Sequence, residues 1–200
     1  IFQSIEVTAP DGTQLSGDLY TSATQDISPG LLLLASSNDV WGNLPQQLQQ
    51  KGYTVLVMPL RANLVINSAT AVGDFEAMIQ SLEQVADPGH LGVIGAQGGA
   101  DVGLAGCAVE ALCDALVMLS PTSLDIAQNT ITRYNPRPLY LAVAQDDSAS
   151  YAIIQYLRSA AQGEVGYDAP SGSASGAALL QADPTLSDQL IQWISKELNS

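Results

Sequence analysis

Few residues of this chain can move protons or attack a carbonyl carbon near neutral pH. His90 is the single histidine, and histidine is the side chain that most often acts as a general base in that pH range. His90 precedes the apolar run Leu91–Ile94, which we expect to be a buried strand. Sites in sheets of parallel strands lie beyond the carboxyl ends of the strands. We therefore predict that His90 is a surface loop residue, which leaves Ser120 and Ser173 without a basic partner.

Two cysteines, Cys107 and Cys113, are the residues with redox or metal chemistry. Their separation, across the end of an expected helix, allows a disulfide in an oxidising compartment. The alternative is two buried thiols that pack as small apolar groups. No C-x-x-C or C-x-x-C-H pattern occurs, so a zinc ribbon or a c-type haem has no ligands. We predict no metal site and no cofactor.

The charge balance excludes some classes of partner. The sequence has 20 acidic and 6 basic residues, a net charge of −14. Such a chain repels the phosphates of nucleic acids and anionic lipid headgroups, and its basic residues are scattered rather than clustered. We expect no nucleic-acid binding. The apolar runs are shorter than the roughly 20 residues that a membrane-spanning helix needs, so we expect no transmembrane segment.

The start of the sequence suggests export. It begins Ile1-Phe2-Gln3, without an initiator methionine, and Gln, Ser, Thr and Asn supply most of its polarity. Both features are typical of a mature protein whose signal peptide has been removed. We expect an exported protein, whether extracellular, at the cell surface or periplasmic.

Apolar patterns predict an alternation of strands and helices. Phe2–Ala9 and Gln14–Tyr20 alternate around Asp11-Gly12, which predicts a hairpin. Continuous apolar runs predict strands and amphipathic segments predict helices. The expected strands are Leu31–Ala35, Tyr53–Met58, Leu91–Ile94, Leu116–Leu119, Leu139–Ala144 and Val165–Tyr167, and the expected helices are Trp41–Lys51, Phe75–Val85 with Asp74 as N-cap, Gly98–Leu112, Tyr151–Ala161 and Leu186–Leu198. The pattern predicts one α/β domain over residues 1–200, with helices on both faces of a mostly parallel sheet.

Several short motifs add a more specific signal. In chain order they are Ala9-Pro10-Asp11-Gly12, Lys51-Gly52-Tyr53-Thr54-Val55-Leu56, Leu60-Arg61, Gly92 to Ala100, Leu119-Ser120-Pro121, Arg137-Pro138-Leu139-Tyr140, Asp146-Asp147 and Ala174-Ser175-Gly176. In this order and at these separations they resemble the α/β-hydrolase superfamily, especially its dienelactone-hydrolase-like and small-esterase group. The resemblance covers nearly the whole chain. It implies a sheet of about eight strands that begins with a hairpin, and no lid domain.

The resemblance also assigns the three positions of a catalytic triad. Gly95-Ala96-Gln97-Gly98-Gly99 stands where the superfamily has G-x-S-x-G, the sharp turn that presents the nucleophilic serine. Gln97 therefore occupies the nucleophile position. Asp147 best matches the acid, and Ser175 stands where the histidine base is expected.

Two of these replacements remove the expected chemistry. An amide does not attack a carbonyl as an activated hydroxyl does, and a serine hydroxyl does not titrate near neutral pH. Where it was measured, loss of one triad member lowers turnover by about 10⁴–10⁶. We therefore expect a catalytically degenerate member of the superfamily, with no catalytic residue and no enzyme activity.

The resemblance further suggests which residues line the old cleft. After the expected strand Leu31–Ala35, the superfamily often has a His-Gly pair that helps to form the oxyanion hole, whereas this chain has Ser36 and Asn38 in that loop. Together with Gly98 and Asp146 they are our candidates for cleft-lining residues.

Three hypotheses about function follow. The first is a structural or interaction subunit of an exported assembly, held by a protein partner or by self-association, because the chemistry is missing and the Ser120–Pro138 connection leaves little room for a lid. The second is a module that binds a small molecule, such as a carbohydrate, in the cleft, with a cation held by Asp101, Asp146 and Asp147 as a weaker variant. The third is a weak esterase with displaced catalytic groups.

Overall fold

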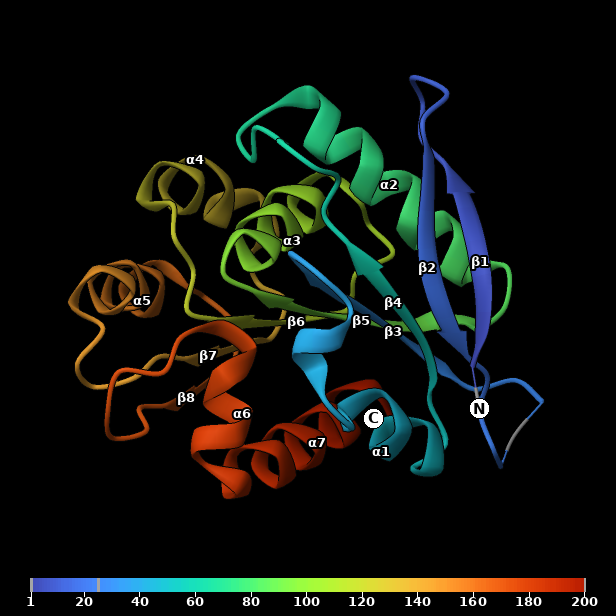
Figure 1. The fold of residues 1–200 in the computed structure, drawn as a ribbon. Coiled ribbons are helices and arrows are strands. Elements are labelled where there is room, and N and C mark those ends of the chain that lie inside the picture. The colour runs from blue at the N-terminus through green and yellow to red at the C-terminus, as the bar shows by residue number, and fades with distance from the viewer. Residues whose placement is uncertain (1, 25, 200) are drawn as a thin grey trace.

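An eight-stranded open sheet forms the centre of the molecule (Figure 1). The computed structural model describes residues 2–24 and 26–199, so Ile1, from which the expectation of export was partly drawn, lies outside it. The strand order is β1-β2-β4-β3-β5-β6-β7-β8. The β1–β2 hairpin and the β2–β4 pair are antiparallel, and the other pairs are parallel. The predicted fold class is confirmed: a mostly parallel sheet that begins with a hairpin.

The strands and helices alternate along the chain as predicted. The strands are β1 (Gln3–Thr8), β2 (Gln14–Tyr20), β3 (Pro29–Ala35), β4 (Thr54–Pro59), β5 (Asp87–Ala96), β6 (Ala115–Leu119), β7 (Leu139–Ala142) and β8 (Val165–Asp168). The α-helices are α1 (Leu44–Gln50), α2 (Ala69–Glu83), α3 (Gly98–Val109), α4 (Leu124–Tyr134), α5 (Ser148–Ala160), α6 (Leu179–Ala182) and α7 (Pro184–Leu198). Two short 3₁₀ helices, η1 (Asp39–Trp41) and η2 (Gly176–Ala178), follow β3 and precede α6.

Helices cover both faces of the sheet, which explains the continuous apolar runs. Along β3, Leu32 and Leu34 belong to the core cluster that includes residues of α2, α3, α4 and α5, whereas Leu31 and Leu33 belong to the cluster that includes residues of α1, α6 and α7. Alternate side chains of a strand point to opposite faces, so a strand buried on both sides must be apolar throughout. The two helical layers are seen above and below the sheet in Figure 1.

Two expected elements differ from the structure. The Ser120–Pro138 segment was expected to be a short connection, yet it contains the 11-residue helix α4. Its apolar residues Ile126, Ile131 and Tyr134 are buried on one side, and the Ser123 hydroxyl accepts the Ile126 N–H at its start. These residues have helical spacing with polar residues between them, so the sequence carried a signal for this helix that the prediction overlooked.

Helix α2 begins earlier than predicted. Ser68, and not Asp74, is its N-cap, because the Ser68 hydroxyl accepts the Ala71 N–H at 3.1 Å. Asp74 lies inside the helix and is only 2% exposed. A buried carboxylate needs a cationic or hydrogen-bonding partner, and Arg61 supplies it.

Arg61 joins the N-terminal hairpin to α2. Its Nε donates to Asp74 Oδ2 at 2.7 Å, and its Nη1 donates to Asp11 Oδ2 at 2.7 Å in the β1–β2 turn. Its Nη2 contacts both carboxylates. The Arg61 hydrogen bonds lower the pKa of Asp11 below its ordinary value of 3.8. One guanidinium therefore holds together a turn, the end of β4 and a helix.

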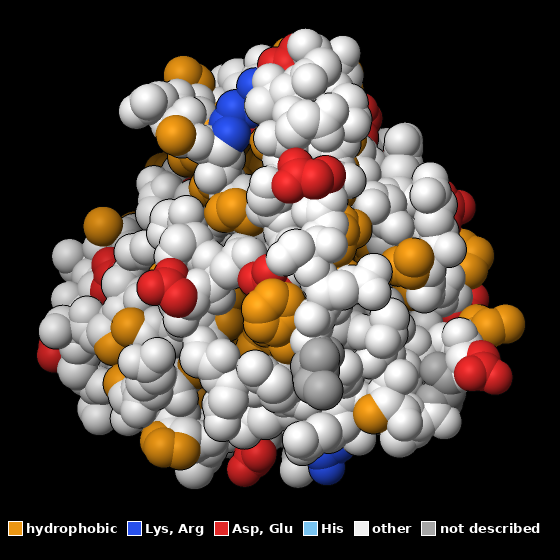
Figure 2. Space-filling model, turned by 45° about the vertical axis from the view of Figure 1, so that its right-hand side comes forward, with side chains coloured by type: hydrophobic (Ala, Val, Ile, Leu, Met, Phe, Trp, Pro, Cys, Tyr) orange, Lys and Arg blue, Asp and Glu red, His pale blue; other side chains and the backbone are white. Residues whose placement is uncertain are grey.

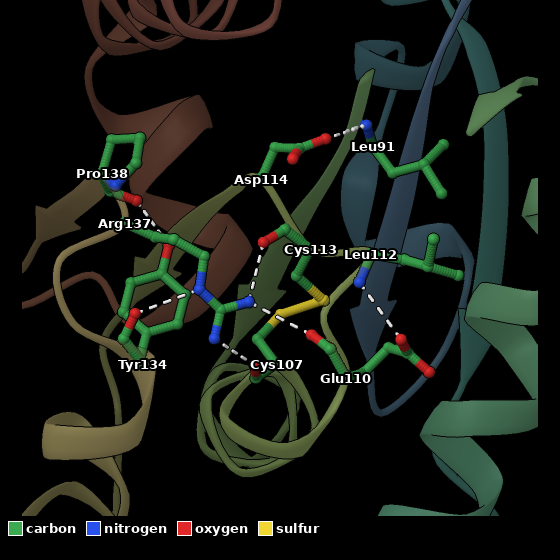
Figure 3. The surroundings of a disulfide bond; sticks show 9 residues. All are labelled: Leu91, Cys107, Glu110, Leu112, Cys113, Asp114, Tyr134, Arg137 and Pro138. Carbon is green, nitrogen blue, oxygen red and sulfur yellow. Dashed lines mark hydrogen bonds between the residues drawn. A yellow bond between two sulfur atoms is a disulfide. The ribbon is translucent and has the colours of Figure 1, made fainter. Parts of the chain in front are cut away.

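The end of α3 is held by a cysteine pair and a second arginine (Figure 3). Cys107 and Cys113 are joined as a disulfide, with their Cα atoms 5.4 Å apart. The Arg137 guanidinium donates to the carbonyl oxygens of Cys107, Glu110 and Cys113, and its centre lies 4.6 Å from the middle of the Tyr134 ring. A cation at the carboxyl end of a helix stabilises the exposed carbonyl groups there.

Among the charged side chains of the surface, acidic ones outnumber basic ones. On the face drawn in Figure 2 they lie apart from one another rather than in one cluster, and basic side chains are few. No described helix has the length and apolar character needed to cross a bilayer.

We predict that the Arg61 contacts make stability sensitive to acid. The pKa of Asp11 is lower in the folded protein than in the unfolded chain, so its stabilising contribution is present above the ordinary pKa. That contribution is lost as the pH falls through the lowered value. Between about pH 5 and about pH 2, the urea midpoint of the wild type should therefore fall more than that of Asp11→Asn. Asp188→Asn, at an exposed position on α7, is the control and should follow the wild type.

We also predict a measurable contribution from the disulfide. Closing a loop of this length stabilises a protein by about 2 kcal/mol through loss of entropy in the unfolded chain. Urea unfolding with and without dithiothreitol should show this difference in the wild type. The Cys107→Ala/Cys113→Ala variant should be less stable and unaffected by the reductant. Alkylation of both thiols in unreduced, denatured protein would contradict the bridge.

Candidate functional site

The turn between β5 and α3, residues Gly95–Gly99, has a strained backbone, and we call it the elbow. Gln97 has φ 52° and ψ −123°, a conformation that side-chain-bearing residues rarely adopt. Its N–H donates to the Leu119 carbonyl at the end of β6, at 2.8 Å. This geometry points the side chain of residue 97 away from the sheet, beyond the carboxyl ends of the strands.

Close packing of α3 against β3 makes the elbow sharp. A Cβ atom on Gly99 would lie 2.0 Å from the carbonyl oxygen of Leu34, which no side chain can tolerate. The first turn of α3 therefore rests directly on the end of β3. Because β4 and β5 lie on opposite sides of β3, the elbow is at the switch point where open α/β sheets bind ligands.

A cavity of about 230 Å³ opens beside Gln97, and we call it the elbow cavity. Its polar lining consists of Ser36, Gln97, Ser175 and Gln181, and its apolar lining consists of Val40 and the alanines at 35, 96, 177 and 178. Two amides and two hydroxyls supply both donors and acceptors. No lining residue carries a charge, so this part of the structure favours an uncharged ligand.

Gln97 and Ser175 contact each other across the elbow cavity. Gln97 Nε2 donates to Ser175 Oγ at 3.1 Å, although the residues are 78 positions apart. The structure thus brings together the predicted nucleophile and base positions. Neither group titrates near neutral pH, so the pair forms a neutral hydrogen bond and cannot transfer a proton to a base.

The predicted acid position has another contact. Asp147 precedes α5, and its Oδ1 accepts the Ser150 N–H at 3.1 Å as a helix cap. Asp146 is exposed, and its N–H donates to the Gly172 carbonyl. Neither aspartate is among the residues that line the elbow cavity.

The other candidate cleft residues lie in different surroundings. Ser36 lines the elbow cavity. Asn38 does not, because its Nδ2 donates to Asp18 Oδ2 at 2.9 Å. Gly98 belongs to the elbow, and the space beside its Cα is bounded by Leu60 and Ile66 rather than by the cavity.

His90 cannot serve residue 97. It lies near the start of β5 and contacts Asp87, with Nδ1 3.0 Å from Oδ2. At about 3.3 Å per residue, the strand separates it from Gln97 by about 23 Å. The histidine is therefore at the amino-terminal end of the strands, as predicted, but it belongs to β5 and not to a loop.

The carboxylate of Asp101, one turn into α3, is buried and hydrogen-bonded to protein groups. It accepts hydrogen bonds from the N–H groups of Thr122 and Ser123 and from the Thr122 hydroxyl. Burial raises the pKa of Asp101, and these hydrogen bonds oppose the rise. Among residues 2–24 and 26–199 no group of three metal-ligating side chains is found.

Val40 and Gln181 line the cavity but were not among the predicted cleft residues. Val40 belongs to η1 and Gln181 to α6, two elements that were not predicted. Both are too short for an apolar period to show, so no signal in the sequence marked them.

Comparisons with known proteins support the fold. No family model matches the sequence, and no curated protein matches it. Among solved structures, the α/β hydrolase GrgF of Penicillium is 11% identical, matches 100% of both chains and has a TM-score of 0.81. An esterase of Pyrococcus furiosus is 16% identical over 99% of this chain and 91% of its own, with a TM-score of 0.79. A dienelactone hydrolase of Anabaena variabilis is 16% identical over 99% of this chain and 98% of its own, with a TM-score of 0.77. The chain has the α/β-hydrolase fold.

These similarities correct the first functional hypothesis. The prediction of a structural or interaction subunit of an exported assembly is wrong, because the solved structures that match the chain along its length are hydrolases and esterases. One of the two arguments for it also fails, because the Ser120–Pro138 connection contains a helix.

We predict that the strain at the elbow can be measured as stability. Gln97→Gly removes the cost of a positive φ and should raise the free energy of unfolding by about 1 kcal/mol, even though the bond to Ser175 is lost. For a chain of this size that is about 2–4 °C in the thermal midpoint. The same substitution at Gln128, exposed inside α4, should instead lower stability by about 0.5 kcal/mol. Equal losses at both positions would show that residue 97 is unstrained.

Proposed function

We propose that the elbow cavity binds a small, uncharged carbonyl compound of the ester or amide class. The observation on which this depends is the neutral polar lining at the switch point of the sheet, with the Gln97–Ser175 pair at its centre. The structural neighbours named as hydrolases and esterases support this ligand class, because esters and related compounds contain a carbonyl group.

The donors and acceptors in the cavity suit such a ligand. Gln97 uses one of its two N–H groups on Ser175, so the other N–H and Oε1 stay available. Gln181 and Ser36 add further donors and acceptors. A carbonyl oxygen can accept from an amide N–H, and an amide ligand can also donate to an amide oxygen. The alanines and Val40 suit the apolar remainder of such a molecule.

We further propose that a bound ligand forms no covalent intermediate with Gln97. An acyl group cannot be transferred to Gln97, because an amide nitrogen is a poor nucleophile and no base contacts it. Ser175 has the same limitation, since its partner is the Gln97 amide and not a histidine. Covalent catalysis through residue 97 is therefore absent from this proposal, and recognition of the carbonyl group is retained.

The size of the cavity sets the expected affinity. A volume of about 230 Å³ holds about a dozen non-hydrogen atoms. At about 0.3 kcal/mol for each atom, the binding free energy is about −4 kcal/mol, which corresponds to a Kd of about 1 mM. A ligand of this size resembles a phenyl ester or anilide more closely than a long lipid.

We also propose that the chain works outside the reducing cytoplasm. The Cys107–Cys113 pair at bonding distance supports this location, because such bonds persist in oxidising compartments. The excess of acidic over basic residues does not distinguish one exported location from another.

Binding can be tested with acetanilide, a neutral amide of suitable size. In two-dimensional ¹⁵N–¹H spectra it should shift the signals of residues around the elbow cavity, with a Kd of about 1 mM. Gln97→Ala should weaken binding at least about tenfold because it removes the central donor and acceptor. Gln128→Ala, on the exposed side of α4, should leave the affinity unchanged. Equal affinity for all three proteins would refute the site.

Turnover is tested with phenyl acetate and a fluorophosphonate label. We expect neither acceleration of phenol release nor labelling of the wild type. The Gln97→Ser/Ser175→His variant places a hydroxyl and an imidazole at the two contacting positions and should become labelled. Rapid hydrolysis by the wild type that disappears in Gln97→Ala, but not in Gln128→Ala, would contradict this part of the proposal.

A further inference from the structure

Ser120, at the end of β6, is a buried polar residue with a strained backbone. It is 0% exposed and has φ 51°, a conformation that glycine adopts more readily than serine. Its N–H donates to the Ala142 carbonyl at 2.9 Å, and its Oγ accepts the Gly176 N–H at 2.9 Å. The backbone conformation therefore disfavours serine at position 120. A serine here indicates that its hydroxyl group has a role that outweighs this cost.

Gly176 connects Ser120 to the elbow cavity. It has φ 61°, and a Cβ at this position would lie 2.9 Å from Gln97 Cγ. The stem of Gln97 thus packs directly on the Gly176 backbone. Ser175, the residue before it, accepts the hydrogen bond from Gln97 Nε2. A displacement of Gly176 would move both the surface under Gln97 and the partner of its amide.

The loop that contains Gly176 is attached to the sheet first at its start and then at the elbow. After the last β7–β8 pair, Ala142 with Asp168, the N–H groups of Val143, Gln145 and Asp146 donate to carbonyl groups of residues 168, 170 and 172. Among the described hydrogen bonds of residues 173–177, those that reach the ends of β5 and β6 are Gly176 to Ser120 and Gln97 to Ser175. Of these two hydrogen bonds, the one to the Ser120 hydroxyl is buried and the one to Ser175 is exposed.

We propose that Ser120 is the positioning residue of the elbow cavity. Through Gly176 it fixes Ser175 beside the elbow, and through Ser175 and the Gly176 backbone it sets the direction of the Gln97 amide. This inference rests on the proposed function, because the geometry that it maintains is that of the ligand-binding groups. Ser120 itself does not line the cavity, so it acts on a ligand only through these residues.

The Ser120→Gly variant separates this role from a general contribution to stability. Glycine removes the hydroxyl and also relieves the positive φ, so the thermal midpoint should stay the same or rise. Hydrogen exchange at the Gly176 amide should nevertheless become at least about tenfold faster, because its acceptor is gone. The side-chain amide signals of Gln97, assigned by their absence in Gln97→Ala, should move toward those of glutamines that bond only to water. The Kd for acetanilide should rise at least about tenfold.

The matched control is Ser123→Ala, a few residues further along. The Ser123 hydroxyl also accepts a backbone N–H, that of Ile126, but at the start of α4. This variant should lose stability while Gly176 exchange and the Gln97 signals stay as in the wild type. Ser120→Ala, which keeps the strain, serves as a second variant should Ser120→Gly fold poorly, and the same changes at Gly176 and Gln97 are expected.

The outcomes distinguish the two proposals. Unchanged Gly176 exchange and unchanged Gln97 signals in both Ser120 variants would overturn the positioning role, whether or not acetanilide binds. If both probes change as expected but the wild type does not bind acetanilide, the positioning role is supported and the proposed ligand class fails.

Discussion

The contact between the first turn of α3 and the end of β3 is the constraint on which the site depends. Gly99 lies so close to the Leu34 carbonyl that no side chain fits between them. The chain must therefore turn sharply after β5, and Gln97 takes up the strain as a positive φ. Such strain persists only where the surrounding structure fixes it, and here the Leu119 carbonyl and the packed helix do so.

The elbow presents a neutral group where this fold can present a nucleophile. The geometry that places residue 97 beyond the strand ends is intact, and the cavity beside it is lined by amides, hydroxyls and small apolar side chains. The charged groups of the molecule are used elsewhere: Arg61 ties a turn to a helix, and Arg137 holds the end of α3. The architecture therefore separates the structural charges from the neutral elbow cavity.

Much of the fold could be predicted from local pattern. The hairpin around Asp11-Gly12 and the buried strands have strong signals, because alternation and continuous apolar runs report directly which faces are covered. Helix α4 has the amphipathic spacing that predicts a helix, and this signal was overlooked. The start of α2 was misplaced because a buried Asp74 resembles a cap in sequence. Its partner Arg61 is 13 positions away, beyond the reach of a helical period.

By itself the sequence determined which side chains exist at the elbow and in the 174–176 turn, and hence that neither place offers a group that titrates near neutral pH. Only the tertiary structure decided that Gln97 meets Ser175, that Gly176 meets Ser120, and that Val40 and Gln181 join the same cavity. The physical reason is that secondary structure follows the periodic burial of neighbouring residues. Contacts between residues 56 or 78 positions apart depend instead on the order of the strands in the sheet, which decides which loops lie side by side.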